Sequence, residues 1–348
     1  MLRKSLRLCA AASLLSVFAC TQTAPAASSA RLIERTATSM GSELQLTAWT
    51  PDEAGAASAF QAVFQETDRL DELMSIWHET SDVERLNAAA GQHPVQISTE
   101  VRDVLETARQ VSDWTDGKFD VTFGALSGLW KFDYQNKDDT IPDRTTVLER
   151  LPLINYRDLE INERSGTAFL RRKGMRANLG GIGKGYAVDS AAHILHRHGI
   201  HDFMIQFGGD MYLAGHRDGR PWRVGIRDPR GPADRIFASL ELTDSTFSTS
   251  GDYERFFIKN GRRYHHILDP GTGEPTEGCR SVTIVTSRAV IADAFAKGVF
   301  ILGPEAGMAL IERTPGIDGV IVSAENQVLV SKGLQGRLTL LARPTDAP

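Results

Sequence analysis

The chain has 348 residues, with 39 lysines and arginines against 44 aspartates and glutamates, so its formal net charge is −5. Its 41% hydrophobic and 24% charged residues are ordinary for a globular protein and exclude a disordered chain, a collagen-like repeat and a multispanning membrane protein. The mildly acidic balance argues against nucleic acid as a partner, because proteins that bind it usually carry a basic stripe.

The first 26 residues have the layout of a secretory signal peptide. Residues 1–7 are basic and contain no acid, and residues 8–19 form an apolar run that is too short to span a bilayer comfortably. Small residues and a turn-like stretch follow. This layout predicts that residues 1–26 are removed on export and take no part in the fold.

Two cleavage sites compete within this leader. Residues 17–20 resemble a lipoprotein box, in which residues 1–19 are the signal and Cys20 becomes the acylated first residue. Residues 24–26 instead form an A-x-A site for ordinary cleavage. We favour the lipoprotein and expect the protein in a bacterial periplasm, tethered to a membrane through Cys20. Cys279 is the only cysteine after the leader, so we expect no internal disulfide.

The first half of the body contains more helix than strand signals. Residues 27–37 are expected to be a linker, and the alternation over residues 43–49 predicts a strand. Apolar residues recur at helical spacing over residues 54–76, and Ser98 or Thr99 caps a second helix that ends near residue 112. The charged stretch 133–145 predicts an exposed loop.

The second half mixes strands and helices without a regular alternation. A helix over residues 183–198 follows a glycine-rich turn, a buried helix covers residues 289–302, and Pro304 opens another helix. The predicted strands cover residues 203–207, 222–227, 236–242 and 281–286, and a closing hairpin pairs residues 320–323 with 328–330. This order favours an α+β fold over a doubly wound sheet.

The glycine-rich turn at residues 178–186 is suited to an anion. Its four glycines let a phosphate approach the backbone N–H groups, and the following helix start and Lys184 add positive charge. It is not a Walker A loop, because Gly185 follows Lys184, and Tyr186 breaks the dinucleotide fingerprint. From these residues alone, a phosphate site and a plain tight turn remain equal alternatives.

Two further segments carry candidate chemistry. His266 and Asp269 are three residues apart at a turn, where a carboxylate can hold a histidine in one tautomer for use as a base or donor. Asp293 and Lys297 are four apart in the apolar helix, so they share one face of it. A charged pair in such a helix is either a buried ion pair or part of a site.

Taken together, the motifs resemble the ApbE family, the bacterial FAD:protein FMN transferases. The shared segments, in chain order, are Met40-Gly41-Ser42, Met74-Ser75, residues 117–122 with Leu129-Trp130, residues 178–189, Gly208-Gly209-Asp210, residues 222–226, 249–253 and 266–270, and Ala292-Asp293-Ala294 leading to residues 302–304. The resemblance implies one α+β, T-fold-like unit over residues 38–340, with two intertwined halves and an FAD cleft between them.

The resemblance also implies an activity. Members of the family bind FAD with Mg²⁺ on its pyrophosphate, cleave the pyrophosphate, and join the FMN phosphate to a threonine hydroxyl of an acceptor protein with release of AMP. For this chain the acceptor is then an exported protein that carries a flavinylation threonine. Two alternatives remain open: an FAD pyrophosphatase that gives FMN and AMP, and a non-catalytic flavin-binding protein that serves electron transfer.

Site residues follow from the resemblance by motif. Residues expected to contact FAD are Met40, Trp77, Lys118, Phe119, Asp120, Asn178, Lys184 and Leu268. His266 is expected to assist transfer to the acceptor hydroxyl, with Asp293 and Lys297 as the other catalytic residues. Mg²⁺ is expected on the carbonyl of Gly181 and the carboxylate of Asp293, because this hard cation prefers oxygen ligands.

Two residues depart from the family pattern. Lys297 stands where the family usually has a metal-binding threonine, and a protonated lysine has no lone pair to give to Mg²⁺. Asn178 stands where the family usually has aspartate, which removes a negative charge near the metal. Both changes point to weaker Mg²⁺ binding. Either the Lys297 ammonium partly replaces the metal at the pyrophosphate, or the site binds flavin without efficient turnover.

Overall fold

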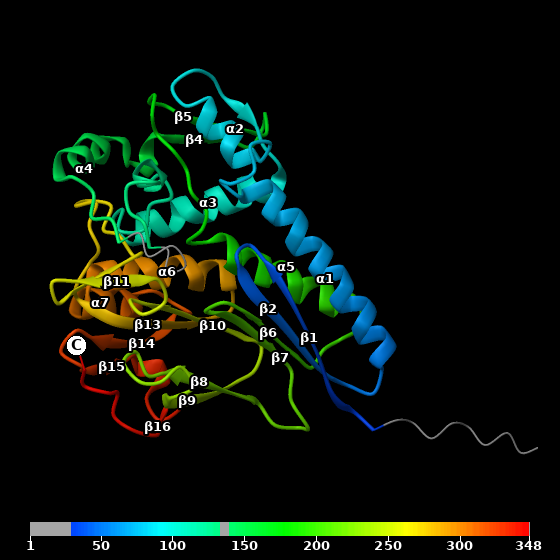
Figure 1. The fold of residues 1–348 in the computed structure, drawn as a ribbon. Coiled ribbons are helices and arrows are strands. Elements are labelled where there is room, and N and C mark those ends of the chain that lie inside the picture. The colour runs from blue at the N-terminus through cyan, green and yellow to red at the C-terminus, as the bar shows by residue number, and fades with distance from the viewer. Residues whose placement is uncertain (1–28, 133–138, 348) are drawn as a thin grey trace, which may run out of the picture.

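A computed structural model describes residues 29–132 and 139–347 of the chain. Within them, an antiparallel eight-stranded sheet has the order β1-β2-β6-β7-β10-β13-β14-β15. The bounds of its strands are Arg31–Ser39, Ser42–Thr50, Phe203–Phe207, Asp210–Ala214, Ser245–Gly251, Cys279–Thr286, Asp318–Ser323 and Val328–Val330. The first hairpin therefore shares one sheet with strands from the second half of the chain, so the halves are intertwined (Figure 1).

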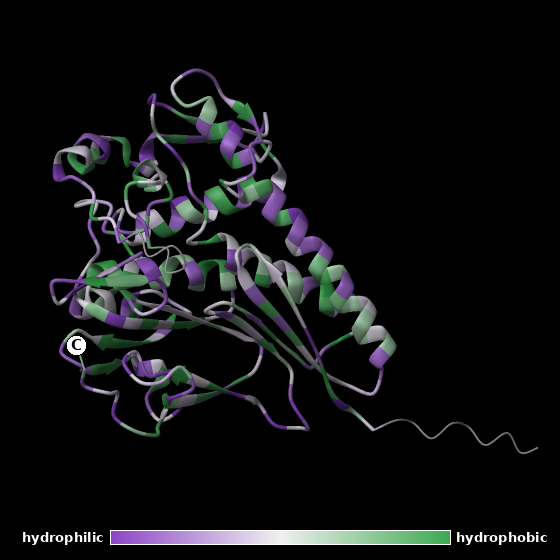
Figure 2. Cartoon of the chain, viewed as in Figure 1, coloured by the Kyte–Doolittle hydropathy of each residue, from purple (hydrophilic) through white to green (hydrophobic). Residues whose placement is uncertain are grey.

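Helices cover one face of this sheet. They are α1 (Glu53–Met74), α5 (Gly183–Arg197), α6 (Ala289–Leu302) and α7 (Pro304–Arg313), and α3 (Thr99–Trp114) packs on α6 from the far side. Helix α6 is apolar on nearly all sides (Figure 2), because it is enclosed by α3, α5, α7 and the sheet. The core between these layers therefore lies directly around α6.

A second, smaller core lies on the other face of the sheet. Strands β8 (Trp222–Arg227), β9 (Ile236–Leu242) and β16 (Thr339–Leu340) form a separate three-stranded sheet there. The buried Phe237 and Trp222 of this sheet belong to one cluster with Phe247 of β10. Both faces of the eight-stranded sheet are thus covered in its second half.

Most of the remaining helices and strands lie at the upper end of the molecule in Figure 1, and the β11–β12 pair lies below them. They are α2 (Asp82–Ala88), β3 (Val95–Gln96), α4 (Arg144–Arg150), β4 (Leu159–Asn162), β5 (Thr167–Leu170), β11 (Phe256–Lys259) and β12 (Arg262–His265). Strands β3, β5 and β4 pair as a small sheet, and β11 pairs with β12. None of the described helices is long and apolar enough to cross a membrane.

Most predicted elements are confirmed to within a few residues, including the α+β class and the closing hairpin. The linker prediction is wrong beyond residue 30, because β1 begins at Arg31 and pairs with β2 along its whole length. The predicted loop 133–145 ends in α4, which starts at Arg144, and its residues 133–138 lie outside the described part. The signal peptide prediction, residues 1–26, also lies outside it.

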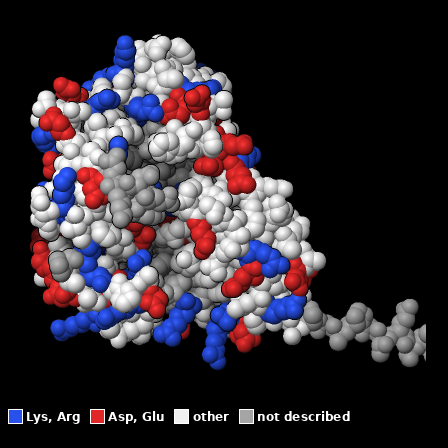
Figure 3. Space-filling model, in the orientation of Figure 1, with Lys and Arg blue, Asp and Glu red and all other residues white. Residues whose placement is uncertain are grey.

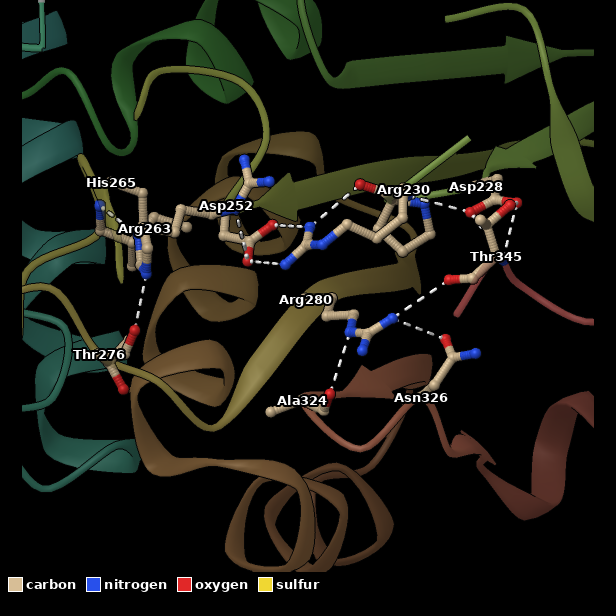
Figure 4. A network of polar contacts seen from close by, with 12 residues as sticks. Asp228, Arg230, Asp252, Arg263, His265, Thr276, Arg280, Ala324, Asn326 and Thr345 are labelled. Atoms are coloured by element: carbon tan, nitrogen blue, oxygen red, sulfur yellow. Dashed lines mark hydrogen bonds and ion pairs between the residues drawn. The ribbon is translucent and has the colours of Figure 1, made fainter. Parts of the chain in front are cut away.

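The C-terminal tail continues past the expected boundary at residue 340. A network of buried arginines and carboxylates fixes it (Figure 4), in which Arg230 makes two 2.7 Å hydrogen bonds to Asp252. The Thr345 amide and hydroxyl donate to Asp228, at 2.9 and 2.7 Å, and the Thr345 carbonyl accepts from Arg280 at 3.2 Å. The folded unit therefore extends to the end of the described chain.

Helices α5 and α6 meet unusually closely. A side-chain carbon added to Gly185 would lie 2.3 Å from the carbonyl oxygen of Ala289, so only glycine fits there. The carboxylate of Asp189 accepts the first amides of α6, from Ala289 at 2.7 Å and from Val290 at 3.0 Å. Asp189 thus caps α6 from a neighbouring helix, although α6 has no side-chain cap of its own.

We expect Asp189→Ala to lower the free energy of unfolding by about 2 kcal/mol, because two amides at the start of a buried helix lose their acceptor. Urea denaturation followed by circular dichroism measures this. Asp68→Ala, which removes an exposed carboxylate from α1, is the matched control. Equal unfolding free energies for the two variants would contradict the capping role.

Candidate active site

A cleft of about 910 Å³ opens between the sheet with its helices and the loops that follow α1 and α3. Figure 3 shows the surface hollowed in this region, with acidic and basic residues interspersed over the same face. All twelve predicted site residues line the cleft: Met40, Trp77, Lys118, Phe119, Asp120, Asn178, Gly181, Lys184, His266, Leu268, Asp293 and Lys297. Segments far apart in the sequence therefore meet at one place, and the role of each residue stays a prediction.

The glycine-rich turn forms one wall of the cleft. The side-chain oxygen of Asn178 accepts the amide of Gly180 at 2.8 Å, which makes the tight turn that precedes α5. Met40 lies in the β1–β2 turn. Its positive φ of 46° is the left-handed conformation that a two-residue hairpin turn requires. A carbon added to Gly183 would be 3.5 Å from the Met40 methyl, so the two segments are in contact.

The floor of the cleft carries two ammonium groups and two carboxylates. Lys184 Nζ lies 3.5 Å from Asp210 Oδ2, and Lys297 forms an ion pair with Asp293. Asp293 is fully buried, and its second oxygen accepts the amide of Gly185 at 3.0 Å. The four groups together are formally neutral, which is what burial of charge at this density requires.

The lysines and carboxylates of this cluster shift one another's pKa values. Burial alone would lower the pKa of Lys184, but the carboxylates of Asp293 and Asp210 raise it above its ordinary value. Burial alone would raise the pKa of Asp293, but Lys184 and Lys297 hold it below its ordinary value. Burial, followed by the nearby Asp293, raises the pKa of Asp210. The ammonium of Lys184 is therefore charged at neutral pH.

Asp210 is outside the predicted set, yet it is a member of this cluster. Its carboxylate is buried and accepts the Ser248 hydroxyl in addition to facing Lys184. The signal available in the sequence is its position directly after Gly208 and Gly209, both of which also line the cleft. Gly209 has a packing reason as well, since an added carbon would lie 2.5 Å from the Thr249 carbonyl oxygen.

The predicted Mg²⁺ ligands do not fit a resident Mg²⁺. The Lys297 ammonium is hydrogen-bonded to Asp293 Oδ1 and, at 3.0 Å, to the Asp293 carbonyl oxygen. Its chain also runs along Gly181, where an added carbon would lie 3.1 Å from Lys297 Cδ. A lysine thus fills the space between the two expected ligands. Among the described residues, no three carboxylate, histidine or cysteine side chains gather as a metal site.

Lys118 and Asp120 have structural partners in addition to their place in the cleft. Lys118 Nζ lies 2.9 and 3.1 Å from the Asp269 oxygens, so an ion pair joins the loop after α3 to the turn after β12. The buried Asp120 carboxylate accepts the amides of Thr122 and Tyr156, both at 2.8 Å. These hydrogen bonds fix the Asp120 carboxylate within its own loop.

Trp77 and His266 differ sharply in exposure. Trp77 is 86% exposed at the cleft, so its ring is free to pack against a ligand. His266 lines the cleft, but its Nδ1 is buried without a hydrogen-bond partner. Burial, followed by the nearby His265 and Lys297, lowers the pKa of His266 to about 3, so its imidazole is neutral at pH 7.

His266 has a pKa of about 6.5 in the unfolded chain and a lower one in the fold, so it binds a proton more readily when unfolded. The fold therefore loses stability as the pH falls below about 6.5. The wild type loses unfolding free energy between pH 7 and pH 5, and we expect His266→Gln to reduce that loss by about 2 kcal/mol. Urea denaturation at both pH values measures it. His198→Gln, at an exposed helix end, is the control, and equal losses for both variants would contradict the assignment.

Comparison with known proteins agrees with this geometry. The chain matches the ApbE family model over residues 40–321. It is 30% identical to an FAD:protein FMN transferase of Klebsiella pneumoniae, over 86% of this chain and 92% of that protein, and 31% identical to one of Treponema pallidum, over 82% of each.

Solved structures show the same fold. The ApbE protein of Thermotoga maritima has a TM-score of 0.80 and 29% identity, and the flavin transferase ApbE of Vibrio cholerae has a TM-score of 0.79 and 27% identity. Each covers 88% of this chain and 99% of its own. The sequence match and the shared fold lead to one conclusion: this chain belongs to the ApbE family.

Proposed function

We propose that this chain transfers FMN from FAD to a threonine hydroxyl of an acceptor protein. The observation that carries the proposal is the composition of the cleft, which joins an apolar rim of Trp77 and Met40, together with the mostly buried Phe119, to a floor with two ammoniums. Such a cleft suits a ligand that has flat rings at its ends and phosphates in its middle. The relatives named FAD:protein FMN transferase support the same assignment.

The reaction is an exchange at phosphorus. The threonine oxygen bonds to the phosphorus of the FMN half, the bond from that phosphorus to the oxygen of the AMP half breaks, and AMP leaves. The hydroxyl proton is released, so the sum is FAD plus protein hydroxyl giving FMN-protein, AMP and one proton. Such a reaction depends mostly on positioning and on charge stabilisation, which Lys184 and its neighbours supply.

His266 is suited to hold the acceptor hydroxyl. Its neutral imidazole can accept a hydrogen bond, and it lies in the same cleft as the two ammoniums. Negative charge brought by a bound pyrophosphate raises the pKa of His266 toward its ordinary value, which makes the imidazole a better proton acceptor when substrate is present.

The sequence-based prediction of Mg²⁺ stays a prediction. The donor set around Asp293 does not fit a resident Mg²⁺, because Lys297 occupies it. The proposed reaction therefore uses no step through a metal.

We also infer that the protein acts outside the cytoplasm, in a bacterial periplasm, with an exported acceptor. The support is the N-terminal sequence alone: a basic head, a short apolar run and a cleavage region. Lipidation at Cys20 would tether the protein to a membrane. Mass spectrometry of the mature N-terminus decides this, since an acylated Cys20 supports the tether and a free Ala27 excludes it.

The test of the function is incubation of residues 27–348 with FAD and an acceptor domain that carries a flavinylation threonine. We expect flavin fluorescence on the acceptor after denaturing electrophoresis, an equal amount of AMP, and no transfer when the threonine is replaced by valine. FMN and AMP formed without acceptor would identify a pyrophosphatase instead. FAD that stays bound and intact in every reaction would identify a flavin-binding protein without this chemistry.

We expect Trp77→Ala to weaken FAD binding about tenfold, because an exposed indole gains its stabilisation by stacking on a ligand ring. Quenching of flavin fluorescence measures the dissociation constant. The melting temperature without ligand should not change, and Trp77→Phe should retain most of the affinity. Unchanged FAD affinity in Trp77→Ala would remove this residue from the binding site.

A further inference from the structure

We propose that the Lys297 ammonium takes the place of a divalent cation at the pyrophosphate of FAD, so that this enzyme binds and uses FAD without Mg²⁺. The proposal rests on the proposed function and deepens it, because it names a group that binds the phosphates. It assigns Lys297 as a residue that contacts substrate.

The Lys297 side chain lies where a phosphate would bind. The aliphatic part of its side chain lies against Gly181 in the glycine-rich turn, and its ammonium bonds to Asp293 on the preceding turn of α6. Its side chain is 19% exposed, and the residue lines the cleft. The ammonium is thus held at the floor, between the backbone that approaches a phosphate and the buried carboxylate below it.

The Lys297 ammonium has an N–H donor to spare for a ligand. A lysine ammonium has three N–H donors, and in the described part of the chain the bonds of Lys297 go to two acceptors, the Asp293 carboxylate and the Asp293 carbonyl. One donor is left for an oxygen of a bound phosphate. Lys184, on the first turn of α5, presents a second charged ammonium to the same cleft.

The surroundings of Asp293 disfavour a bound metal ion. Both oxygens of the Asp293 carboxylate already have partners, the Lys297 ammonium on one and the Gly185 amide on the other. A divalent cation placed against Asp293 would also lie beside the Lys297 ammonium and be repelled by it. The pyrophosphate is accordingly met by ammonium donors, and the bonds made and broken at phosphorus are those of the proposed transfer.

The direct test uses the unaltered protein. FAD is titrated into residues 27–348 in EDTA and in millimolar Mg²⁺, with flavin fluorescence as the readout. We expect the two dissociation constants to agree within twofold, and we expect transfer to the acceptor to proceed in EDTA. The proposal would be overturned if Mg²⁺ lowers the dissociation constant tenfold or more, or if transfer stops in EDTA.

The variant Lys297→Thr tests the residue itself. Threonine removes the ammonium, frees the Asp293 carboxylate and adds a hydroxyl oxygen, so we expect FAD binding in EDTA to weaken tenfold or more and Mg²⁺ to restore it. Mn²⁺ added to protein and FAD gives a second readout by electron paramagnetic resonance. The wild type should leave the signal of free Mn²⁺ unchanged, and Lys297→Thr should reduce it.

Controls separate charge from folding. Lys173→Thr removes an exposed lysine away from the cleft and should behave as the wild type. Lys297→Arg keeps a cation and should bind FAD in EDTA more tightly than Lys297→Thr does. Circular dichroism reports whether each variant is folded, and if Lys297→Thr is not, the wild-type titration alone decides.

The outcomes distinguish this proposal from the proposed function. Transfer that occurs only with Mg²⁺ leaves the FMN transferase intact and overturns the role of Lys297. Tight FAD binding in EDTA without transfer under any condition supports the role of Lys297 in binding and overturns the transferase. Failure to bind FAD with or without Mg²⁺ overturns both.

Discussion

The close approach of helices α5 and α6 is the constraint on which the site depends. Gly185 permits it, because any side chain there would collide with the backbone of α6. The contact places the buried Asp293 carboxylate against the amide of Gly185 and beside Lys184. A buried carboxylate needs positive partners, and Lys184 and Lys297 supply them at the floor of the cleft.

The arrangement gives each wall of the cleft a separate task. The floor carries fixed charge, the glycine-rich turn brings bare backbone close to it, and the rim offers Trp77 and Met40 for planar rings. The two intertwined halves are held together by the shared sheet and by the Lys118–Asp269 ion pair. Positioning and electrostatics are therefore built into the rigid frame before substrate arrives.

Much of this could be predicted from the sequence, because strong periodicity and glycine motifs are local signals. The strand at residues 203–207 and the helix at 289–302 are examples. Strand β1 is missed, because its pairing partner rather than its own pattern defines it. Asp189 caps α6 from about 100 residues away, and a local sequence pattern cannot predict such a tertiary contact. The Lys297–Asp293 pair could be suspected from spacing, but its contact with Gly181 required the fold.

The role of the two ammoniums is tested most directly by a crystal structure of the FAD complex grown in EDTA. We expect pyrophosphate oxygens within hydrogen-bond distance of both Lys184 Nζ and Lys297 Nζ, with the isoalloxazine or adenine ring against Trp77. A pyrophosphate bound away from both ammoniums, or a Lys297 side chain displaced from Asp293 by a metal retained through purification, would contradict it.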